Sequence, residues 1–72
     1  MEPLWGIDLG GTKIEGVVLD ALHPLRVRFR QRIPTEAHMG YAHILSRIGV
    51  LLDEMKAATG LVPSRLGIGT PG

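Results

Sequence analysis

The hydrophobic residues of this chain follow two patterns, one typical of strands and one typical of a helix. Short runs rich in Val, Ile and Leu predict strands at Leu4–Leu9, 14–19, 25–33 and 65–68. Between the last two runs, apolar residues recur at spacings of three and four over about residues 38–59, which predicts an amphipathic helix. The order strand, strand, strand, helix, strand predicts an α/β domain.

The run at residues 25–33 alternates between apolar residues and arginines. The apolar positions are Leu25, Val27, Phe29 and Ile33, and the alternate positions are Arg26, Arg28, Arg30 and Arg32. Clustered arginines can bind nucleic-acid phosphates, but the net charge is only +1 and the chain has three aromatic residues for base stacking. A solvated edge strand, whose charges prevent unwanted strand pairing, is therefore favoured over nucleic-acid binding. A contact with another molecule is the remaining alternative.

The predicted helix has one apolar stripe, which would pack on the sheet. The stripe consists of Tyr41, Leu45, Ile48, Leu52 and Met55, widened by Ile44 and Leu51. Gly60 and Pro63 form a common stop arrangement, and Thr35 is a candidate N-cap. A helical crossover predicts that the fourth strand is parallel to the first.

The turn Gly10-Gly11-Thr12 joins the first two strands and carries the candidate chemistry. Glycines allow a turn with positive φ, and such a tip presents backbone N–H groups beside the Thr12 hydroxyl and the Lys13 ammonium. These groups can hold phosphate oxygens. The nearby carboxylate of Asp8 would repel phosphate unless a cation lay between them, so the pattern indicates Mg²⁺.

The same turn is compatible with two other structures. Residues 6–13 spell G-x-x-x-x-G-T-K, which is similar to a P-loop. A P-loop has Lys before the hydroxyl residue and a helix after it, whereas here Thr12 precedes Lys13 and a strand-like sequence follows. The P-loop is therefore rejected. A plain hairpin, in which the glycines serve only the turn, is the second alternative.

Composition limits the remaining possibilities. The chain has 72 residues, 44% of them hydrophobic and 21% charged, which indicates one small globular domain with a marginal core. It has no Cys for a disulfide, and His38 and His43 are spaced too far apart to share a helix face for a metal. Asp8 interrupts the first apolar run, so we predict no signal peptide, no membrane span and a cytoplasmic location.

Two motifs resemble those of a known family. Gly6-Ile7 leads into Asp8-Leu9-Gly10-Gly11-Thr12-Lys13, and the tail reads Leu66-Gly67-Ile68-Gly69-Thr70-Pro71-Gly72. The first resembles the first phosphate motif of the sugar-kinase/actin/Hsp70 superfamily, specifically of the ROK (repressor, open reading frame, kinase) family. The second is similar to that family's following strand and Gly-x-Pro-Gly loop. The two motifs and the elements between them cover essentially the whole chain.

The resemblance implies a fold and a set of site residues. The fold would be a ribonuclease-H-like (actin-like ATPase) half-lobe, β-β-β-α-β with a mixed sheet, with residues 1–72 as the N-terminal part of the first lobe. Phosphate groups of ATP would be bound by Gly10, Gly11, Thr12 and Lys13, Mg²⁺ by Asp8 through water, and Thr70, Pro71 and Gly72 would lie near a sugar pocket. The family's catalytic Asp and its structural zinc site would lie outside these residues.

The implied function is that of an ATP-dependent kinase acting on a hexose or N-acetylhexosamine, with the 72 residues inactive alone. Few residues precede the hairpin, which favours a kinase over a regulator with an N-terminal DNA-binding domain. The alternatives are a non-catalytic ROK regulator fragment, an actin-like interaction module, and a nucleic-acid binder that uses the arginines. The expected partners are ATP, a sugar, and either the rest of its own lobe or a second copy. Such a copy would pair with the outer edge of the fourth strand or with an apolar, uncovered sheet face.

Overall fold

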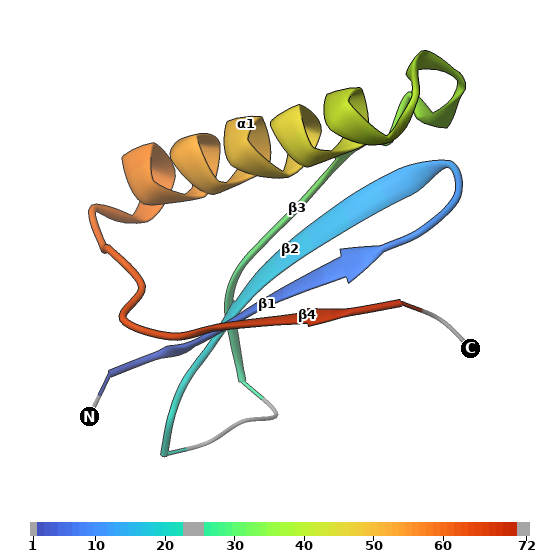
Figure 1. Ribbon diagram of the computed structural model, residues 1–72. Helices are drawn as coiled ribbons and strands as arrows, with labels where there is room; N and C mark the ends of the chain where they lie inside the picture. The colour runs from blue at the N-terminus through green and yellow to red at the C-terminus, as the bar shows by residue number, and fades with distance from the viewer. Residues whose placement is uncertain (1, 23–25, 71–72) are drawn as a thin grey trace.

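The described part of the chain forms a four-stranded mixed sheet with one α-helix on one of its faces (Figure 1). The computed structural model describes residues 2–22 and 26–70. In chain order the elements are β1 (Leu4–Leu9), β2 (Lys13–Leu19), β3 (Val27–Pro34), a 3₁₀ turn (Ala37–Met39), α1 (Tyr41–Thr59) and β4 (Leu66–Gly69). The strand order is β3-β2-β1-β4, with β1 antiparallel to β2 and parallel to β4. The α/β class, the mixed sheet and the parallel fourth strand are confirmed.

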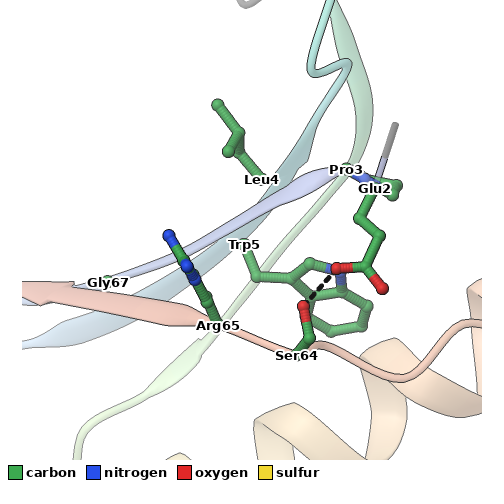
Figure 2. Close-up of a pocket in the computed structure, with 7 residues that line it drawn as sticks. All are labelled: Glu2, Pro3, Leu4, Trp5, Ser64, Arg65 and Gly67. Carbon is green, nitrogen blue, oxygen red and sulfur yellow. Dashed lines mark hydrogen bonds between the residues drawn. The ribbon is translucent and has the colours of Figure 1, made fainter.

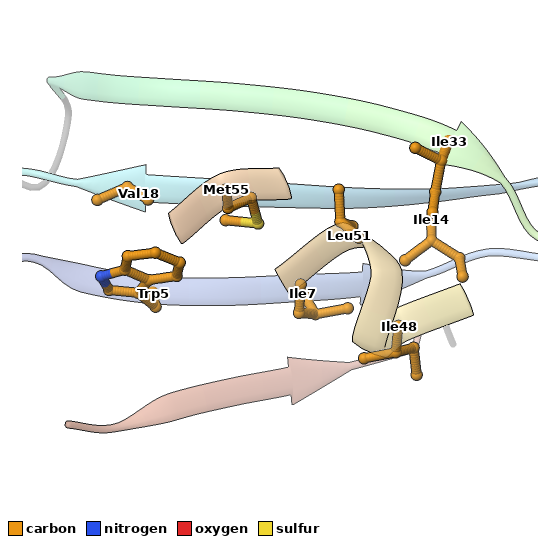
Figure 3. Packing of buried hydrophobic residues seen from close by; sticks show 8 residues of the cluster. All are labelled: Trp5, Ile7, Ile14, Val18, Ile33, Ile48, Leu51 and Met55. Carbon is orange, nitrogen blue, oxygen red and sulfur yellow. The ribbon is translucent and has the colours of Figure 1, made fainter. Parts of the chain in front are cut away.

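The register of the strands separates the sheet into a covered and an open face. Trp5 lies opposite Val18 and Ile7 opposite Gly16, so their side chains share the face under α1. The core between sheet and helix is drawn in Figure 3 and consists of Trp5, Ile7, Ile14, Val18, Ile33, Ile48, Leu51 and Met55. Both the strand alternation and the helix periodicity therefore serve one layer of packing.

Gly16 allows α1 to approach the sheet closely. A Cβ atom at this position would collide with the Sδ atom of Met55 and lie 3.2 Å from Cδ2 of Leu51. Both helix side chains are fully buried. A glycine in the middle of a strand is conformationally unfavourable, but here it provides the space that the helix side chains fill.

The helix buries a narrower stripe than its spacing predicts. Ile48, Leu51 and Met55 are buried, but 76% of Tyr41 and 51% of Leu45 remain exposed. The prediction that these two residues pack on the sheet is wrong. The helix packs mainly over β2 and β3, and the side chains that it buries belong to the core cluster, which does not include Tyr41 or Leu45.

The start of the helix also differs from the prediction. Residues Ala37–Met39 form a 3₁₀ turn, and Gly40, with a φ of 97°, is the residue before α1. Thr35 is not the N-cap, because its side chain bonds elsewhere. The C-terminal stop is confirmed: Gly60 has a φ of 71°, and its N–H donates to the carbonyl of Lys56.

The arginine-bearing strand lies at an edge of the sheet, as predicted. Its first two predicted positions are not part of β3, and Leu25 falls outside the described residues. The Nε atoms of Arg30 and Arg32 both lie 2.8 Å from the carboxylate of Glu15 on β2. Because charged groups occupy part of the open face, the expectation that this face is apolar holds only in part.

β4 occupies the opposite edge of the sheet. Among the described residues it pairs with β1 alone, so its outer N–H and C=O groups form a free edge, as the sequence predicted. No helix within 2–22 and 26–70 is long and apolar enough to span a membrane.

Candidate functional site

The hairpin loop between β1 and β2 closes tightly, but not by positive φ angles. The N–H of Gly10 donates to the carbonyl of Lys13 at 3.0 Å. The described glycines with positive φ are Gly40 and Gly60, so the prediction of a positive-φ turn at Gly10-Gly11 is wrong. Gly10 is needed for a different reason, since a Cβ atom there would lie 2.8 Å from the Lys13 carbonyl oxygen.

Gly11 differs from its neighbour, because no other part of the chain needs the space beside it. A Cβ atom on Gly11 would meet no atom within 4 Å, and the residue is exposed. The requirement for glycine at position 10 therefore comes from the fold. At position 11 the fold imposes no such steric requirement, and the space is open to a ligand.

Thr35 fixes which way the loop backbone points. Its Oγ1 donates to the carbonyl of Gly10 at 2.8 Å, and its N–H donates to the carbonyl of Thr12 at 2.9 Å. Thr35 is itself 1% exposed. The N–H groups of Gly11 and Thr12 donate to no other described residue, so two successive amides are available to an anion.

The segment that carries Thr35 is held against α1. Arg47 donates from Nε to the carbonyl of Pro34 at 3.1 Å, and it also lies 3.2 Å from Oε1 of Glu36. His43 Nε2 lies 2.8 Å from the same Glu36 oxygen. The hydrogen bond with His43, followed by the charge of Arg47, holds the pKa of the Glu36 carboxyl below its usual value. Glu36 has a left-handed φ of 56°, which these contacts help to maintain.

Asp8 and Lys13 extend the site onto the open face of the sheet. Both side chains are exposed, and Asp8 lies directly opposite Glu15. Glu15 is engaged by two arginines, whereas no described cationic side chain lies within ion-pair distance of Asp8. Within the described ranges no three His, Cys, Asp or Glu side chains gather to hold a metal. A single free carboxylate still fits Mg²⁺, which commonly uses one or two carboxylates together with phosphates and water.

The second glycine motif lies at the same end of the sheet as the hairpin loop, where β1 and β4 have their carboxyl ends. β4 is parallel to β1, and Gly69 is in register with Asp8, so Thr70 follows at the carboxyl end of both strands. In open α/β sheets, ligands bind outside the carboxyl ends of the strands. The structure thus brings Asp8, the loop and Thr70 together. Pro71 and Gly72 lie outside the described residues.

A hollow of about 700 Å³ at the other end of the sheet is not the candidate site (Figure 2). Its lining consists of Glu2, Pro3, Leu4, Trp5, Ser64, Arg65 and Gly67. These residues surround the amino ends of β1 and β4, and the Ser64 hydroxyl donates to the Glu2 carboxylate across the opening. The hollow is therefore separated from the glycine loop by the length of β1.

Known proteins match the chain in sequence and in structure. Over 68 residues, 94% of the chain, it is 37% identical to the N-acetyl-D-glucosamine kinase of Salmonella typhimurium and 40% identical to that of Pectobacterium atrosepticum. The inorganic polyphosphate/ATP-glucomannokinase of Arthrobacter sp. strain KM has a TM-score of 0.83 and 28% identity over the whole chain. The resemblance to the ROK sugar kinases is confirmed.

The match to the ROK sugar kinases covers only part of each relative. The chain spans about a fifth of the two N-acetyl-D-glucosamine kinases, 21% of each, and 29% of the glucomannokinase chain. No protein-family model matches the chain. The likeness therefore extends over one sheet and one helix of these kinases.

One residue of the site was missed by the sequence argument. The sequence pattern indicates a helix cap at Thr35, but this residue lies two positions after Ile33, the partner of Ile14 in the β2–β3 register. Continuing that register past Lys13 and Pro34 brings Thr35 beside Thr12. The pairing of the two strands, had it been worked out from their alternation, would have revealed the contact.

Proposed function

We propose that this chain is the phosphate-binding part of an ATP-dependent sugar kinase that transfers a phosphoryl group to a hydroxyl of a hexose or N-acetylhexosamine. Residues 1–72 would be the N-terminal part of the kinase's first lobe, completed by further elements and a second lobe. The observation that carries the proposal is the register of Asp8 with Gly69. It brings two sequence motifs, about 60 residues apart, to the carboxyl ends of two neighbouring parallel strands. Open α/β sheets bind their ligands outside the carboxyl ends of the strands.

The loop residues would position the phosphates of the nucleotide. The free N–H groups of Gly11 and Thr12 would donate to phosphate oxygens, assisted by the Thr12 hydroxyl and the positive charge of Lys13. Gly10 would shape the loop, as its contact with Lys13 requires. Catalysis of phosphoryl transfer rests largely on such positioning and on charge stabilisation.

Asp8 would hold Mg²⁺ through water, and the ion would neutralise charge that develops on the phosphates. Its carboxylate is exposed on the open face beside the loop, with Gly69 as its neighbour on β4. Glycines at 67 and 69 have no side chains that would compete for this space. Thr70, Pro71 and Gly72 would contribute to the sugar pocket.

The relatives define the substrates to be tested. Two are N-acetyl-D-glucosamine kinases, and the structural neighbour is named as a glucomannokinase that uses inorganic polyphosphate or ATP. N-Acetylglucosamine, glucose and mannose are therefore the acceptors to compare, with ATP and polyphosphate as donors. A cytoplasmic location and the absence of nucleic-acid and membrane partners remain predictions. We also propose that the free edge of β4 pairs with the rest of the lobe or with a second copy of the chain.

The deciding experiment measures sugar phosphorylation by the full-length protein and its Gly11→Val variant. A Cβ atom at position 11 meets no atom of this chain within 4 Å, whereas a valine side chain there would displace a bound phosphate, and a displacement of about 1 Å can cost about 100-fold in rate. We expect a loss of about that size in kcat/KM for ATP, with little change in the melting temperature. Gly49→Val is the matched control, since a Cβ at this exposed helix position also meets no atom within 4 Å.

The outcomes separate the kinase from its alternatives. Turnover of none of the three sugars with either donor would contradict the kinase and favour a regulator or interaction module. Equal activity of wild type and Gly11→Val would remove the phosphate role from the loop.

A further inference from the structure

We propose that Thr35 is a positioning residue that orients the glycine loop for the nucleotide phosphates. The inference rests on the proposed function. From the sequence, Thr35 is a candidate helix N-cap, but in the structure Gly40 occupies that position. Thr35 is the one fully buried polar side chain among the described residues, and both of its donors bond to the loop between β1 and β2.

The direction of these two hydrogen bonds is what makes Thr35 functional. They bind the carbonyls of Gly10 and Thr12 on the interior side of the loop. Carbonyl oxygens that turned toward a nucleotide would repel its phosphates. With these two carbonyls fixed, the N–H groups of Gly11 and Thr12 remain without an acceptor among the described residues. Thr35 therefore acts on the electrostatics of the loop without touching the ligand.

The threonine is itself held at a fixed position. Arg47 on α1 donates to the carbonyl of Pro34, the residue before Thr35, and pairs with Glu36, the residue after it. His43 bonds to the same carboxylate. The segment 34–36 consequently links the loop to the first turns of α1, and loss of the Arg47 contact should loosen Thr35 without removing its hydroxyl.

The test compares three substitutions in the full-length protein. Thr35→Val keeps the side-chain shape but removes the bond to Gly10, and a lost hydrogen bond of this kind should weaken MgADP binding about fivefold. Thr35→Ser retains the donor and should restore wild-type affinity. Thr59→Val is the control, because Thr59 also donates from Oγ1 to a backbone carbonyl, that of Met55 at 2.8 Å, near the far end of α1.

The measurements are the dissociation constant of MgADP by calorimetry and separate KM values for MgATP and for the sugar. The inference predicts that Thr35→Val raises the MgADP dissociation constant and the MgATP KM, leaves the sugar KM unchanged, and is rescued by serine. Thr59→Val should leave all three values unchanged. Equal MgADP affinity in wild type and Thr35→Val, or equal changes in both KM values, would overturn it.

A second variant keeps the inference testable if Thr35→Val does not fold. Arg47→Met removes the clamp on segment 34–36 and should raise the MgADP dissociation constant about twofold, within the range of a weakened hydrogen bond. An unchanged constant in a folded Arg47→Met protein would contradict the linkage. Failure of the proposed function itself is distinct, since wild type would then bind no MgADP and phosphorylate no sugar.

Discussion

The two faces of the sheet differ in what their side chains do. The covered face packs Trp5, Ile7 and Val18 against α1, and the described residues leave no buried side-chain polar atom there without a partner. The open face carries Asp8, and Glu15 with its two arginines, beside the glycine loop. Stability is thus concentrated on one face and candidate chemistry on the other. Substitutions on the two faces should therefore affect different measurements.

The largest expected effect is on the covered face. Leu51 is fully buried between helix and sheet, and Leu→Ala substitutions in such cores cost about 2–5 kcal/mol. Leu51→Ala should lower the free energy of unfolding by this amount, while Leu45→Ala, at a half-exposed position, should change it by less than about 0.5 kcal/mol. Urea unfolding, followed by the fluorescence of Trp5, the chain's single tryptophan, measures both. Similar losses in the two variants would mean that α1 packs differently.

A smaller effect on stability is expected from substitutions at two glycines, one on each face of the sheet. Gly16→Ala places a methyl group against Met55 and Leu51, and such overpacking costs about 1–3 kcal/mol. Gly6→Ala lies on the open face, where its Cβ would be at an ordinary distance of 3.5 Å from Cγ1 of Val17. We expect Gly6→Ala to cost less than Gly16→Ala in the same urea experiment. A larger loss of stability in Gly6→Ala than in Gly16→Ala would contradict the close packing of α1 against Gly16.

The next prediction concerns function on the open face. Asp8→Asn should reduce kcat by about 10- to 100-fold, which is typical for loss of a group that hydrogen-bonds to the ligands of a metal ion. Stability should not fall, because Asp8 faces the like charge of Glu15 across the strands. The measurement is a Mg²⁺ titration of sugar phosphorylation, with Asp53→Asn on the exposed side of α1 as the control. Superimposable titrations of wild type and Asp8→Asn would show that Asp8 has no metal role.

The sequence was sufficient for features that depend on local pattern. The strands β1 and β2 and the stop at Gly60 were predicted correctly, and the helical crossover correctly required β4 to be parallel to β1. Features that depend on contacts between distant segments were not. Which turns of α1 reach the sheet is decided by its placement over β2 and β3, so the exposure of Tyr41 could not be read from spacing alone.

The candidate site divides in the same way. Asp8 and the loop residues stand out in sequence because their types match phosphate and Mg²⁺ chemistry. The contribution of Thr35 depends on the β2–β3 register, and the φ angles of the loop depend on the hydrogen bond between Gly10 and Lys13. Residue type therefore indicated which groups could bind phosphate and Mg²⁺, whereas the contacts that support the loop became visible only with the fold.

The smallest expected effect is a pH dependence of stability at Glu36, which lies between β3 and α1. The pKa of the Glu36 carboxyl is lowered by its hydrogen bond with His43 and by the charges of Arg47 and His38, relative to an ordinary value of 4.5. Because the pKa is lower in the folded chain than in the unfolded chain, the ionised carboxylate stabilises the fold fully above the unfolded pKa. This contribution is lost as the pH falls through the folded pKa. It is small, since the group is exposed to solvent screening.

Glu36→Gln removes this ionisation while keeping a side chain of similar size. We expect the variant to be slightly less stable than wild type at pH 7, with the difference shrinking as the pH falls from about 4.5 downward. Melting temperatures measured from pH 7 to pH 3 test this, and Glu54→Gln is a matched control because Glu54 also accepts a side-chain hydrogen bond, from Gln31. A difference between wild type and Glu36→Gln that stayed constant over this range would mean that the carboxylate of Glu36 acts through shape rather than charge. The left-handed turn at Glu36 would then be held by contacts that do not depend on its charge, such as the hydrogen bond from the Met39 N–H to the Glu36 carbonyl.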